Sequence, residues 1–222
     1  MIKGTILDID GVLLDSLGIW DDLGARYLKS IGKNPEDGLN EILFAMSMEQ
    51  GAEYLKKHYN LDESINEINE GLEKMLEDYY FYEVLPKPGA KELLTLLNNE
   101  NIRAVAATSS PRIHIETALK RNGLLNYIEK IFTTGELKVS KHSPDIYNAA
   151  ADFMSLKPEE TLVFEDSLYA LNTAKKAGYV TVGVFDDKGE SNQEGLKKTA
   201  DLYLTDLNMF QNAYRELFNS FV

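Results

Sequence analysis

Two carboxylates stand directly after a short apolar run near the start of the chain. In ILDIDGVLLDS, residues 6–16, Asp8 and Asp10 follow what is predicted to be a buried strand, and Asp15 comes later. An unpaired carboxylate is costly to desolvate. Acids at such a place therefore either face water or meet a cation.

Other polar groups follow other apolar runs. Thr108, Ser109 and Ser110 come after IRAVAA, and Glu165-Asp166 comes after TLVF. Lys141 lies in the connection before a helix that we expect to start near Pro144. Ligands of an open parallel sheet bind beyond the carboxyl ends of its strands. We therefore expect all these groups to meet at one edge of a sheet.

The chemistry of such an edge is phosphoryl transfer. Four carboxylates repel one another unless a divalent cation is present, and oxygen ligands without nearby cysteine or histidine favour Mg²⁺. The hydroxyls and amides of residues 108–110, before a helix beginning with Pro111, form a site for a phosphate, and Lys141 adds positive charge. An aspartate there can act as the nucleophile. Taken singly, each group is also explained as a solvated loop, a helix cap or a surface lysine.

The predicted elements give the class of fold. Apolar strands are expected at 2–7, 102–107, 131–133, 161–164, 180–185 and 202–204, and helices at 90–97, 111–121, from Ser143-Pro144 onward, and from Leu168 to a stop at Gly178. Ser143 is expected to cap its helix, with Pro144 at the first helical position. This alternation indicates an α/β fold, a Rossmann-like doubly wound parallel sheet.

One stretch breaks the alternation. Residues 16–82 show helical periodicity and no convincing strand, and LPKPG then leads back to the sheet. We therefore expect two domains: a catalytic core of residues 1–15 and 83–222, and an inserted α-helical cap of residues 16–82.

Composition excludes several classes of function. The 222 residues carry a formal charge of −13 and no cysteine. That charge opposes binding to nucleic acid or anionic lipid, and without cysteine there is no disulfide framework or thiolate nucleophile. No apolar run approaches the length of a membrane span, and MIKGTILDID lacks the order of a signal peptide, so we expect a cytoplasmic protein.

Four segments together resemble a known family. DIDGVLLDS, ATSS, KHSPDIY and VFEDS are similar to the four ordered motifs of the haloacid dehalogenase superfamily, in the subgroup of β-phosphoglucomutase and small sugar-phosphate phosphatases. The resemblance spans nearly the whole chain, including the helical cap. It implies that Asp8 is the nucleophile and that Asp10 is the general acid and then the general base. It also implies that Thr108 and Lys141 hold the phosphoryl group.

The same resemblance implies a metal site and a phosphate site. Mg²⁺ would be bound by the Asp8 carboxylate, the Asp10 backbone carbonyl and Asp166, with Glu165 assisting directly or through water. The phosphate-binding residues would be Asp8, Gly11, Thr108, Ser109, Ser110 and Lys141.

The residues themselves agree with these roles. Alternation along the strand end turns Ile9 inward and leaves Asp8 and Asp10 on one side, so one can attack while the other protonates the leaving oxygen. Dehalogenating members of the superfamily lack an acid at the second position, because a halide leaves without protonation. Asp10 therefore favours phosphate esters.

Departures from the family pattern concern the motif ends and the cap. His142 replaces the proline that usually follows the lysine, and Ala170 replaces a usual glycine. Members resembling β-phosphoglucomutase carry a histidine and an arginine that support general acid–base transfer and bind the distal phosphate of a sugar bisphosphate. The matching positions here are Trp20 and Met48. Neither side chain carries a charge, so neither can take over these roles. We expect both to line the substrate entrance instead, where they suit a monophosphate with a partly apolar or sugar body. Plain packing is the alternative for Trp20.

A few charged residues remain to be placed. Lys74 and Arg112 could still supply positive charge to a substrate, whereas His58 and His114 are expected at the surface or its boundary.

The sequence thus predicts a Mg²⁺-dependent phosphatase of small phosphorylated metabolites that works through an aspartyl-phosphate and is a monomer. A hexose-phosphate mutase like β-phosphoglucomutase is the main alternative. A signalling module like a receiver domain, which is also phosphorylated on an aspartate, is a further alternative. Such a module would need neither Asp10 as a proton donor nor a cap.

Overall fold

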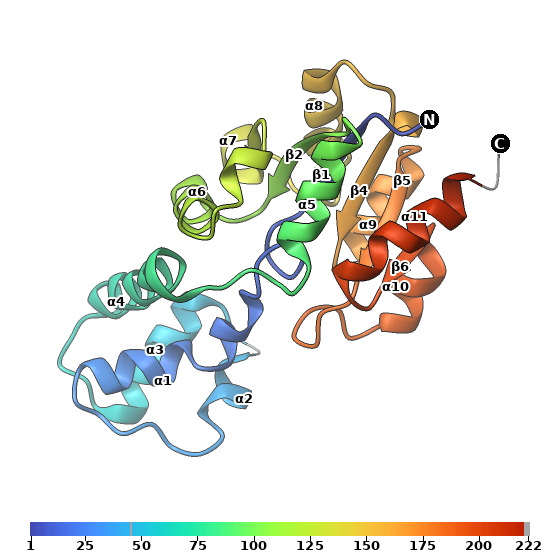
Figure 1. Cartoon of the computed structure of the whole chain (residues 1–222). Coiled ribbons are helices and arrows are strands. Elements are labelled where there is room, and N and C mark those ends of the chain that lie inside the picture. The colour runs from blue at the N-terminus through green and yellow to red at the C-terminus, as the bar shows by residue number, and fades with distance from the viewer. Residues whose placement is uncertain (45, 220–222) are drawn as a thin grey trace. The chain divides into compact units, whose positions relative to one another are not determined.

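The chain divides into two compact units. The structure is a computed structural model that describes residues 1–44 and 46–219, with side chains as far as residue 215. One unit comprises Met1–Ser16 and Leu85–Val222, and the other comprises Leu17–Val84 (Figure 1). The first unit contains a sheet, and the second is helical.

The first unit is built on a six-stranded parallel sheet in the order β3-β2-β1-β4-β5-β6. Its strands are β1 (Gly4–Leu7), β2 (Arg103–Thr108), β3 (Ile131–Thr133), β4 (Thr161–Glu165), β5 (Val180–Val184) and β6 (Leu202–Leu204). The strand order reverses beside β1, which pairs with β2 on one side and with β4 on the other. A reversal of this kind opens a crevice at the carboxyl ends of the strands. This is the doubly wound α/β fold that the sequence predicts.

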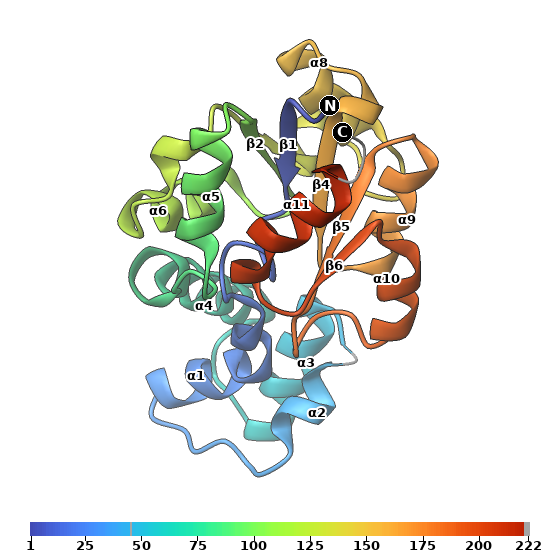
Figure 2. The same cartoon turned by 45° about the vertical axis from the view of Figure 1, so that its right-hand side comes forward.

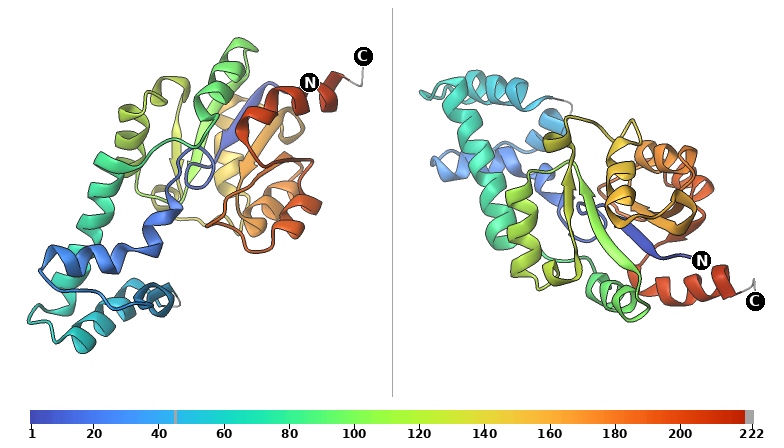
Figure 3. Two further views of the ribbon diagram at one scale, coloured as in Figure 1. Left: turned by 60° about the horizontal axis from the view of Figure 1, so that its bottom comes forward. Right: turned by 90° about the horizontal axis from the view of Figure 1, so that it is seen from above.

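Helices cover both faces of this sheet (Figures 2 and 3). The helices of the unit are α5 (Ala90–Asn99), α6 (Arg112–Arg121), α7 (Thr134–Leu137), α8 (Asp145–Met154), α9 (Leu168–Lys176), α10 (Gln193–Thr199) and α11 (Phe210–Asn219). Ile6 and Val163 pack in one apolar cluster with residues of α8 and α9. The next residue of β4, Phe164, packs on Phe210 of α11, with 5.3 Å between ring centroids. Successive strand residues point to opposite faces, so both layers of helices bury apolar side chains.

Local signals explain most of the ends of these elements. Gly178, with φ of +91°, follows α9 in the left-handed conformation that a helix stop requires, as predicted. The predicted cap of α8 is wrong, because the helix begins at Asp145 and Pro144 occupies the cap position. The hydroxyl of Ser143 donates to Asp145 Oδ2 at 2.7 Å and makes no cap bond.

The second unit is built from helical elements and their connecting turns over its described residues. They are a 3₁₀ helix (Leu17–Asp21), α1 (Leu23–Ser30), α2 (Leu39–Phe44), α3 (Met48–Tyr59), α4 (Ile65–Asp78) and a π-helical turn (Tyr79–Glu83). Capping boxes fix the starts of α3 and α4: Ser47 pairs with Gln50, and Ser64 pairs with Glu67. The unit has its own apolar core, which includes Leu28, Leu55 and Ile68.

Two connecting segments of the first unit lie side by side. Asp15 N donates to Leu85 O, and Lys87 N donates to Leu13 O, both at 2.9 Å. Leu14 and Pro86 form an antiparallel bridge between these bonds. The chain therefore leaves for the helical unit and returns from it at one point of the sheet domain.

Within the part of the chain that the structure describes, no helix combines the length and the apolar character that a membrane span needs.

Candidate functional site

Asp8 stands at the switch point of the sheet. It follows β1 directly, and its N–H donates to Phe164 O of β4 at 3.0 Å, so the strand pairing holds its backbone. Its carboxylate Oδ1 accepts from Ile9 N at 2.8 Å, and the residue is only 8% exposed. Gly11, at φ of +73°, allows the sharp turn that follows.

Two further carboxylates meet Asp8 at this edge. Glu165 is the last residue of β4, and Asp166 follows it. Asp8, Glu165 and Asp166 each offer an oxygen, and these oxygens lie within 4.8 Å of one another. All three residues are buried. The sequence-predicted convergence of acids from two separate strand ends is therefore present in the fold.

Lys141 supplies a cation to this cluster. Its Nζ lies 2.8 Å from Asp8 Oδ1 and 2.8 Å from Glu165 Oε1, and its side chain is 3% exposed. Burial acts to lower the pKa of Lys141, but Asp8 and Glu165 outweigh it and raise that pKa above its usual value. Lys141 therefore stays charged. One lysine facing three carboxylates leaves a negative excess.

Burial and the excess of negative charge raise the pKa values of the acids. Burial, followed by the charge of Asp8, raises the pKa of Asp166 to about 7 and raises the pKa of Glu165 well above its usual range. Burial also raises the pKa of Asp8, an effect that the cation of Lys141 opposes. Without a further cation, the cluster tends to keep protons.

The residues present fit a divalent metal ion. Glu165 Oε2 is buried and has no hydrogen-bond partner among the described residues. A buried carboxylate oxygen without a partner is costly unless a ligand reaches it. All the donors are carboxylate oxygens, which suits hard ions such as Mg²⁺ or Ca²⁺. The geometry alone does not choose between them.

Tyr147 of α8 belongs to this site, although the sequence reasoning missed it. Its hydroxyl donates to Glu165 Oε1 at 2.8 Å, and the residue is fully buried. Burial and the charge of Glu165 raise the pKa of the Tyr147 hydroxyl, which keeps it a donor. A signal was present in IYNAAADF, because a tyrosine on the apolar face of a helix needs a partner for its hydroxyl.

Asp10 is not one of the three carboxylates that meet at this edge, and its own carboxylate is held by hydroxyls. Its Oδ1 accepts from Ser16 Oγ, and its Oδ2 accepts from Ser110 Oγ, both at 2.6 Å. Ser16 is a second residue that the sequence reasoning missed. Asp10 thus joins the end of β1 to the loop after β2, and both of its oxygens have a fixed direction.

The loop after β2 carries the predicted phosphate site. Thr108 ends β2 and is fully buried, and its Oγ1 accepts from Ser110 N at 3.0 Å. Ser109, between them, is exposed. Arg112, which opens α6, is bound to Glu136 at 2.6 Å and is committed to that ion pair.

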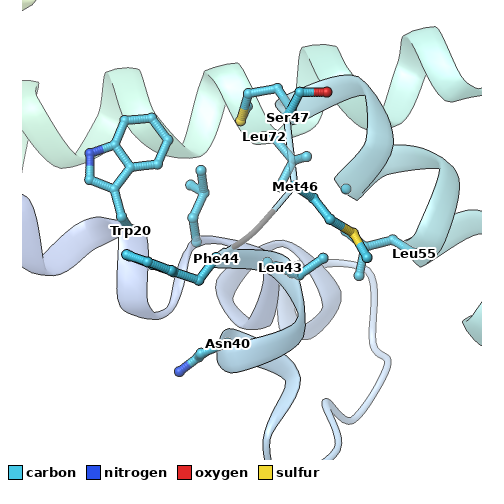
Figure 4. Close-up of a pocket in the computed structure, with 12 residues that line it drawn as sticks. Trp20, Asn40, Leu43, Phe44, Met46, Ser47, Leu55 and Leu72 are labelled. Atoms are coloured by element: carbon cyan, nitrogen blue, oxygen red, sulfur yellow. The ribbon is translucent and has the colours of Figure 1, made fainter.

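Trp20 and Met48, the predicted entrance residues, both line one pocket inside the helical unit. Figure 4 shows this pocket and labels Trp20. Lys74, also in that unit, is paired with Glu77 and Asp78. Neither Lys74 nor Arg112 therefore offers an uncommitted charge.

The histidines have separate surroundings. His142 is exposed and stacks on Tyr169 with 4.4 Å between ring centroids. His58 lies 2.7 Å from Glu36 Oε1. His114 is buried in α6, at 9% exposure, so its expected place at the surface or boundary is wrong.

Fold and site together define an α/β protein with a buried acidic centre, whose three carboxylates could hold a metal ion, at the switch point of its sheet. The sequence matches the model of the haloacid dehalogenase-like hydrolase family over residues 5–184. The chain belongs to this family, as the four motifs predict, and is a hydrolase by that membership.

Named relatives and a solved structure are similar to it. The chain is 25% identical to the phosphorylated carbohydrates phosphatase of Thermotoga maritima, over 80% of this chain and 82% of that protein. It is 27% identical to the β-phosphoglucomutase of Bacillus subtilis, over 96% of this chain and 97% of that protein. The crystal structure of a putative β-phosphoglucomutase from Thermotoga maritima superposes with a TM-score of 0.85 at 23% identity, covering 97% of this chain and 99% of that one. The similarity to this crystal structure, at 23% identity, shows only that the two folds are alike.

Proposed function

We propose that the protein is a Mg²⁺-dependent phosphatase that hydrolyses small organic phosphomonoesters through an aspartyl-phosphate on Asp8. The single observation that carries this proposal is the arrangement around β1. A buried carboxylate, Asp8, faces Lys141, and a second acid, Asp10, stands two residues later with both oxygens held by serine hydroxyls.

In the first step, the Asp8 carboxylate attacks phosphorus, and the bond between phosphorus and the alcohol oxygen breaks. Lys141 Nζ lies 2.8 Å from Asp8 Oδ1, which supports a nucleophile and a cation acting on the same phosphoryl group. Asp10, in its acid form, gives its proton to the departing alkoxide, so the first product is an alcohol.

In the second step, Asp10 takes a proton from a water molecule, and the oxygen of that water attacks the phosphorus of the aspartyl-phosphate on Asp8. The bond between phosphorus and Asp8 breaks, inorganic phosphate leaves, and both aspartates return to their starting states. Thr108, buried at the end of β2, and Lys141 hold the phosphoryl oxygens through both steps.

The cation of this proposal is Mg²⁺. Asp8, Asp166 and the Asp10 carbonyl would hold it, and the unpartnered oxygen of Glu165 would assist directly or through water. When bound, it neutralises the negative charge of the acids and of the phosphate. Residues 16–82 act as the cap, with the core at 1–15 and 83–222. A cytoplasmic location and a monomeric state stay predictions.

A mutase is the second candidate, and one comparison favours it: the likeness to β-phosphoglucomutase runs along almost the whole chain. A mutase must also grip the second phosphate of a bisphosphate. Trp20 and Met48, at the positions that would do so, carry no charge, and this supports the phosphatase.

The test is release of inorganic phosphate from a panel of phosphorylated sugars, nucleotides and small acids, with p-nitrophenyl phosphate as a general substrate. Asp8→Asn should abolish turnover while the fold survives. Asp15→Asn, which removes an exposed aspartate seven residues away, is the matched control and should keep activity. Retained turnover in Asp8→Asn would refute the assignment.

The mutase is tested separately. β-Glucose 1-phosphate is mixed with the enzyme and a bisphosphate activator. Isomerisation without net phosphate release would overturn the phosphatase proposal.

A further inference from the structure

A tight turn carries Lys141 into the acidic centre. Ser143 N donates to Ser140 O at 3.1 Å, so residues 140–143 form the turn, with Lys141 and His142 at its two central positions. Lys141 is buried at 3% exposure, whereas His142 is exposed. The turn therefore places one side chain inside the centre and the next one outside it.

The backbone of this turn is not restrained by regular structure. Residues 138–144 lie between α7 and α8, and Lys138 and Ser140 are exposed. A proline, the usual residue after this lysine in the family, fixes its own φ through its ring, and His142 does not. The position of Lys141 therefore depends on contacts that the side chains of the turn make.

His142 provides such a contact. Its ring stacks on the ring of Tyr169, with the centroids 4.4 Å apart and the planes 28° from parallel. Tyr169 is the second residue of α9, which begins just after Asp166 and Ser167. The same two segments meet inside the centre, where Lys141 Nζ lies 2.8 Å from Glu165 Oε1. The turn and the segment that leads into α9 are thus linked twice, once inside the acidic centre and once outside it.

The Tyr169 hydroxyl lies within electrostatic reach of the acidic centre. Burial raises the pKa of this hydroxyl, the cation of Lys141 lowers it, and the acids Glu165 and Asp8 raise it. The residue is nevertheless 45% exposed. Tyr169 therefore stands at the border between the centre and the solvent, where its ring supports the turn from outside.

We propose that the stacked rings of His142 and Tyr169 position Lys141 in the acidic centre. They are positioning residues, because they act on the turn and not on a reacting group. This role in catalysis rests on the proposed phosphatase function, whereas the role in the turn stands on the geometry alone. A surface stack that only adds stability is the alternative that the experiments must separate.

A second stack of the same kind provides the matched control. The rings of Tyr54 and His58 have centroids 5.0 Å apart and planes 13° from parallel. Both residues belong to α3, so their stack links no turn to another element. Tyr54→Leu removes this stack as Tyr169→Leu removes the other, and leucine is a good helix former at both places.

The first test measures how firmly Lys141 is held. The metal-free protein is treated briefly with acetic anhydride, and mass spectrometry compares acetylation of Lys141 with that of Lys138, an exposed lysine of the same segment. We expect this ratio to rise by about fivefold in Tyr169→Leu and in His142→Ala, the size of effect that an aromatic pair carries. Tyr169→Phe and His142→Phe keep two rings, so they should keep the wild-type ratio, as should Tyr54→Leu.

A double variant shows whether the two rings act together. His142→Ala/Tyr169→Leu should raise the ratio no further than either single change, because each change already breaks the stack. In urea unfolding, Tyr169→Leu should lose as little stability as Tyr54→Leu, since both replace an exposed or half-buried ring.

The second test measures the reaction with p-nitrophenyl phosphate. Because Lys141 holds the phosphoryl group in the proposed mechanism, we expect kcat/KM to fall by about fivefold in Tyr169→Leu and in His142→Ala. Inhibition by inorganic phosphate should weaken in the same two variants. Tyr169→Phe, His142→Phe and Tyr54→Leu should match the wild type.

Loss of either ring without a change in Lys141 acetylation would overturn the inference. Additive effects in the double variant, an equal rise in Tyr54→Leu, or a general loss of stability in Tyr169→Leu would also do so, because they assign the stack a structural role only. A raised ratio with unchanged kinetics would refute the role in catalysis. If the wild type hydrolyses no phosphomonoester, the proposed function fails, and acetylation alone decides whether the stack positions Lys141.

Discussion

At the scale of single residues, the two oxygens of Glu165 have different tasks. Oε1 accepts from both Tyr147 and Lys141, whereas Oε2 has no partner among the described residues. The tyrosine hydroxyl and the lysine together fix the plane of the carboxylate. The other oxygen therefore remains available to a ligand such as a metal ion, and its direction depends on Tyr147 as well as on Lys141.

Removing the Tyr147 hydroxyl should weaken metal binding. We expect Tyr147→Phe to lower the affinity for Mg²⁺ by about tenfold, since residues that orient a ligand carry effects of that size. Calorimetric titration of the substrate-free protein measures it. Tyr179→Phe is the matched control, because the Tyr179 hydroxyl is bound to Asn148 at 2.9 Å, away from the acids. An equal loss of affinity in both variants would contradict this role.

The raised pKa of Asp166 predicts proton release on metal binding. Because its pKa of about 7 in the fold exceeds the ordinary value of 3.8, protonated Asp166 stabilises the metal-free protein at low pH, and this contribution is lost as pH rises through 7. A metal ion needs the ionised form. Near pH 6.5, Mg²⁺ binding should expel a proton, so its heat should differ between buffers of unlike ionisation enthalpy. Identical heats in the two buffers would refute this.

The acids of the centre and Lys141 were predictable from the sequence, but the hydroxyl groups that bind Glu165 and Asp10 were not. Asp8, Glu165 and Lys141 each follow or precede an element that the apolar pattern reveals, and parallel strands bring such ends together. Tyr147 was missed because its role depends on which face of α8 meets the end of β4. Ser16 was missed because its role depends on how the chain folds back after β1. The roles of the predicted residues in catalysis stay predictions.

At the scale of elements, a buried ion pair ties the segment around Pro86, where the chain returns from the helical unit, to the end of a strand. Lys87 Nζ lies 2.6 Å from Asp186 Oδ2, with the side chains 14% and 3% exposed, and also donates to Phe185 O at 2.8 Å. Asp186 comes just after β5. The pair therefore fixes the segment that leads into α5 against the carboxyl end of a neighbouring strand.

Breaking this pair should destabilise the protein. We expect Lys87→Met to lower the free energy of unfolding by about 3 kcal/mol, because it leaves a buried carboxylate without its cation. The double variant Lys87→Met/Asp186→Leu should lose less than Lys87→Met alone. Urea unfolding measures both. Lys57→Met, which removes an exposed partner of Glu53, should change nothing measurable. Additive losses would show that the two groups do not interact.

The element pattern was predictable because apolar runs and turn residues reveal it locally. The strand at 131–133 and the strand at 202–204 have the predicted ends. The first strand is shorter than expected, starting at Gly4 rather than residue 2. The order of the strands in the sheet depends on how the whole chain folds, so it could not be predicted from the positions and lengths of the apolar runs.

At the scale of the molecule, the charge of −13 stands out. Self-repulsion of this size destabilises the compact state, and salt screens it. We expect the Tm of the metal-free protein at pH 8 to rise between about 0.02 and 0.3 M NaCl. At the isoelectric pH, about 4.7, the same salt should have little effect. A flat or falling Tm at pH 8 would contradict this expectation.

The paired segments around Leu14 and Pro86 make the helical unit a replaceable module. Any inserted domain whose two ends lie as close as neighbouring strands could be grafted between them without altering the register of the sheet. Over evolutionary time such a junction permits recombination. The hydrolytic machinery can be inherited intact while the inserted part is exchanged, shortened or redesigned, and the same junction offers protein engineers a natural place for building chimaeras.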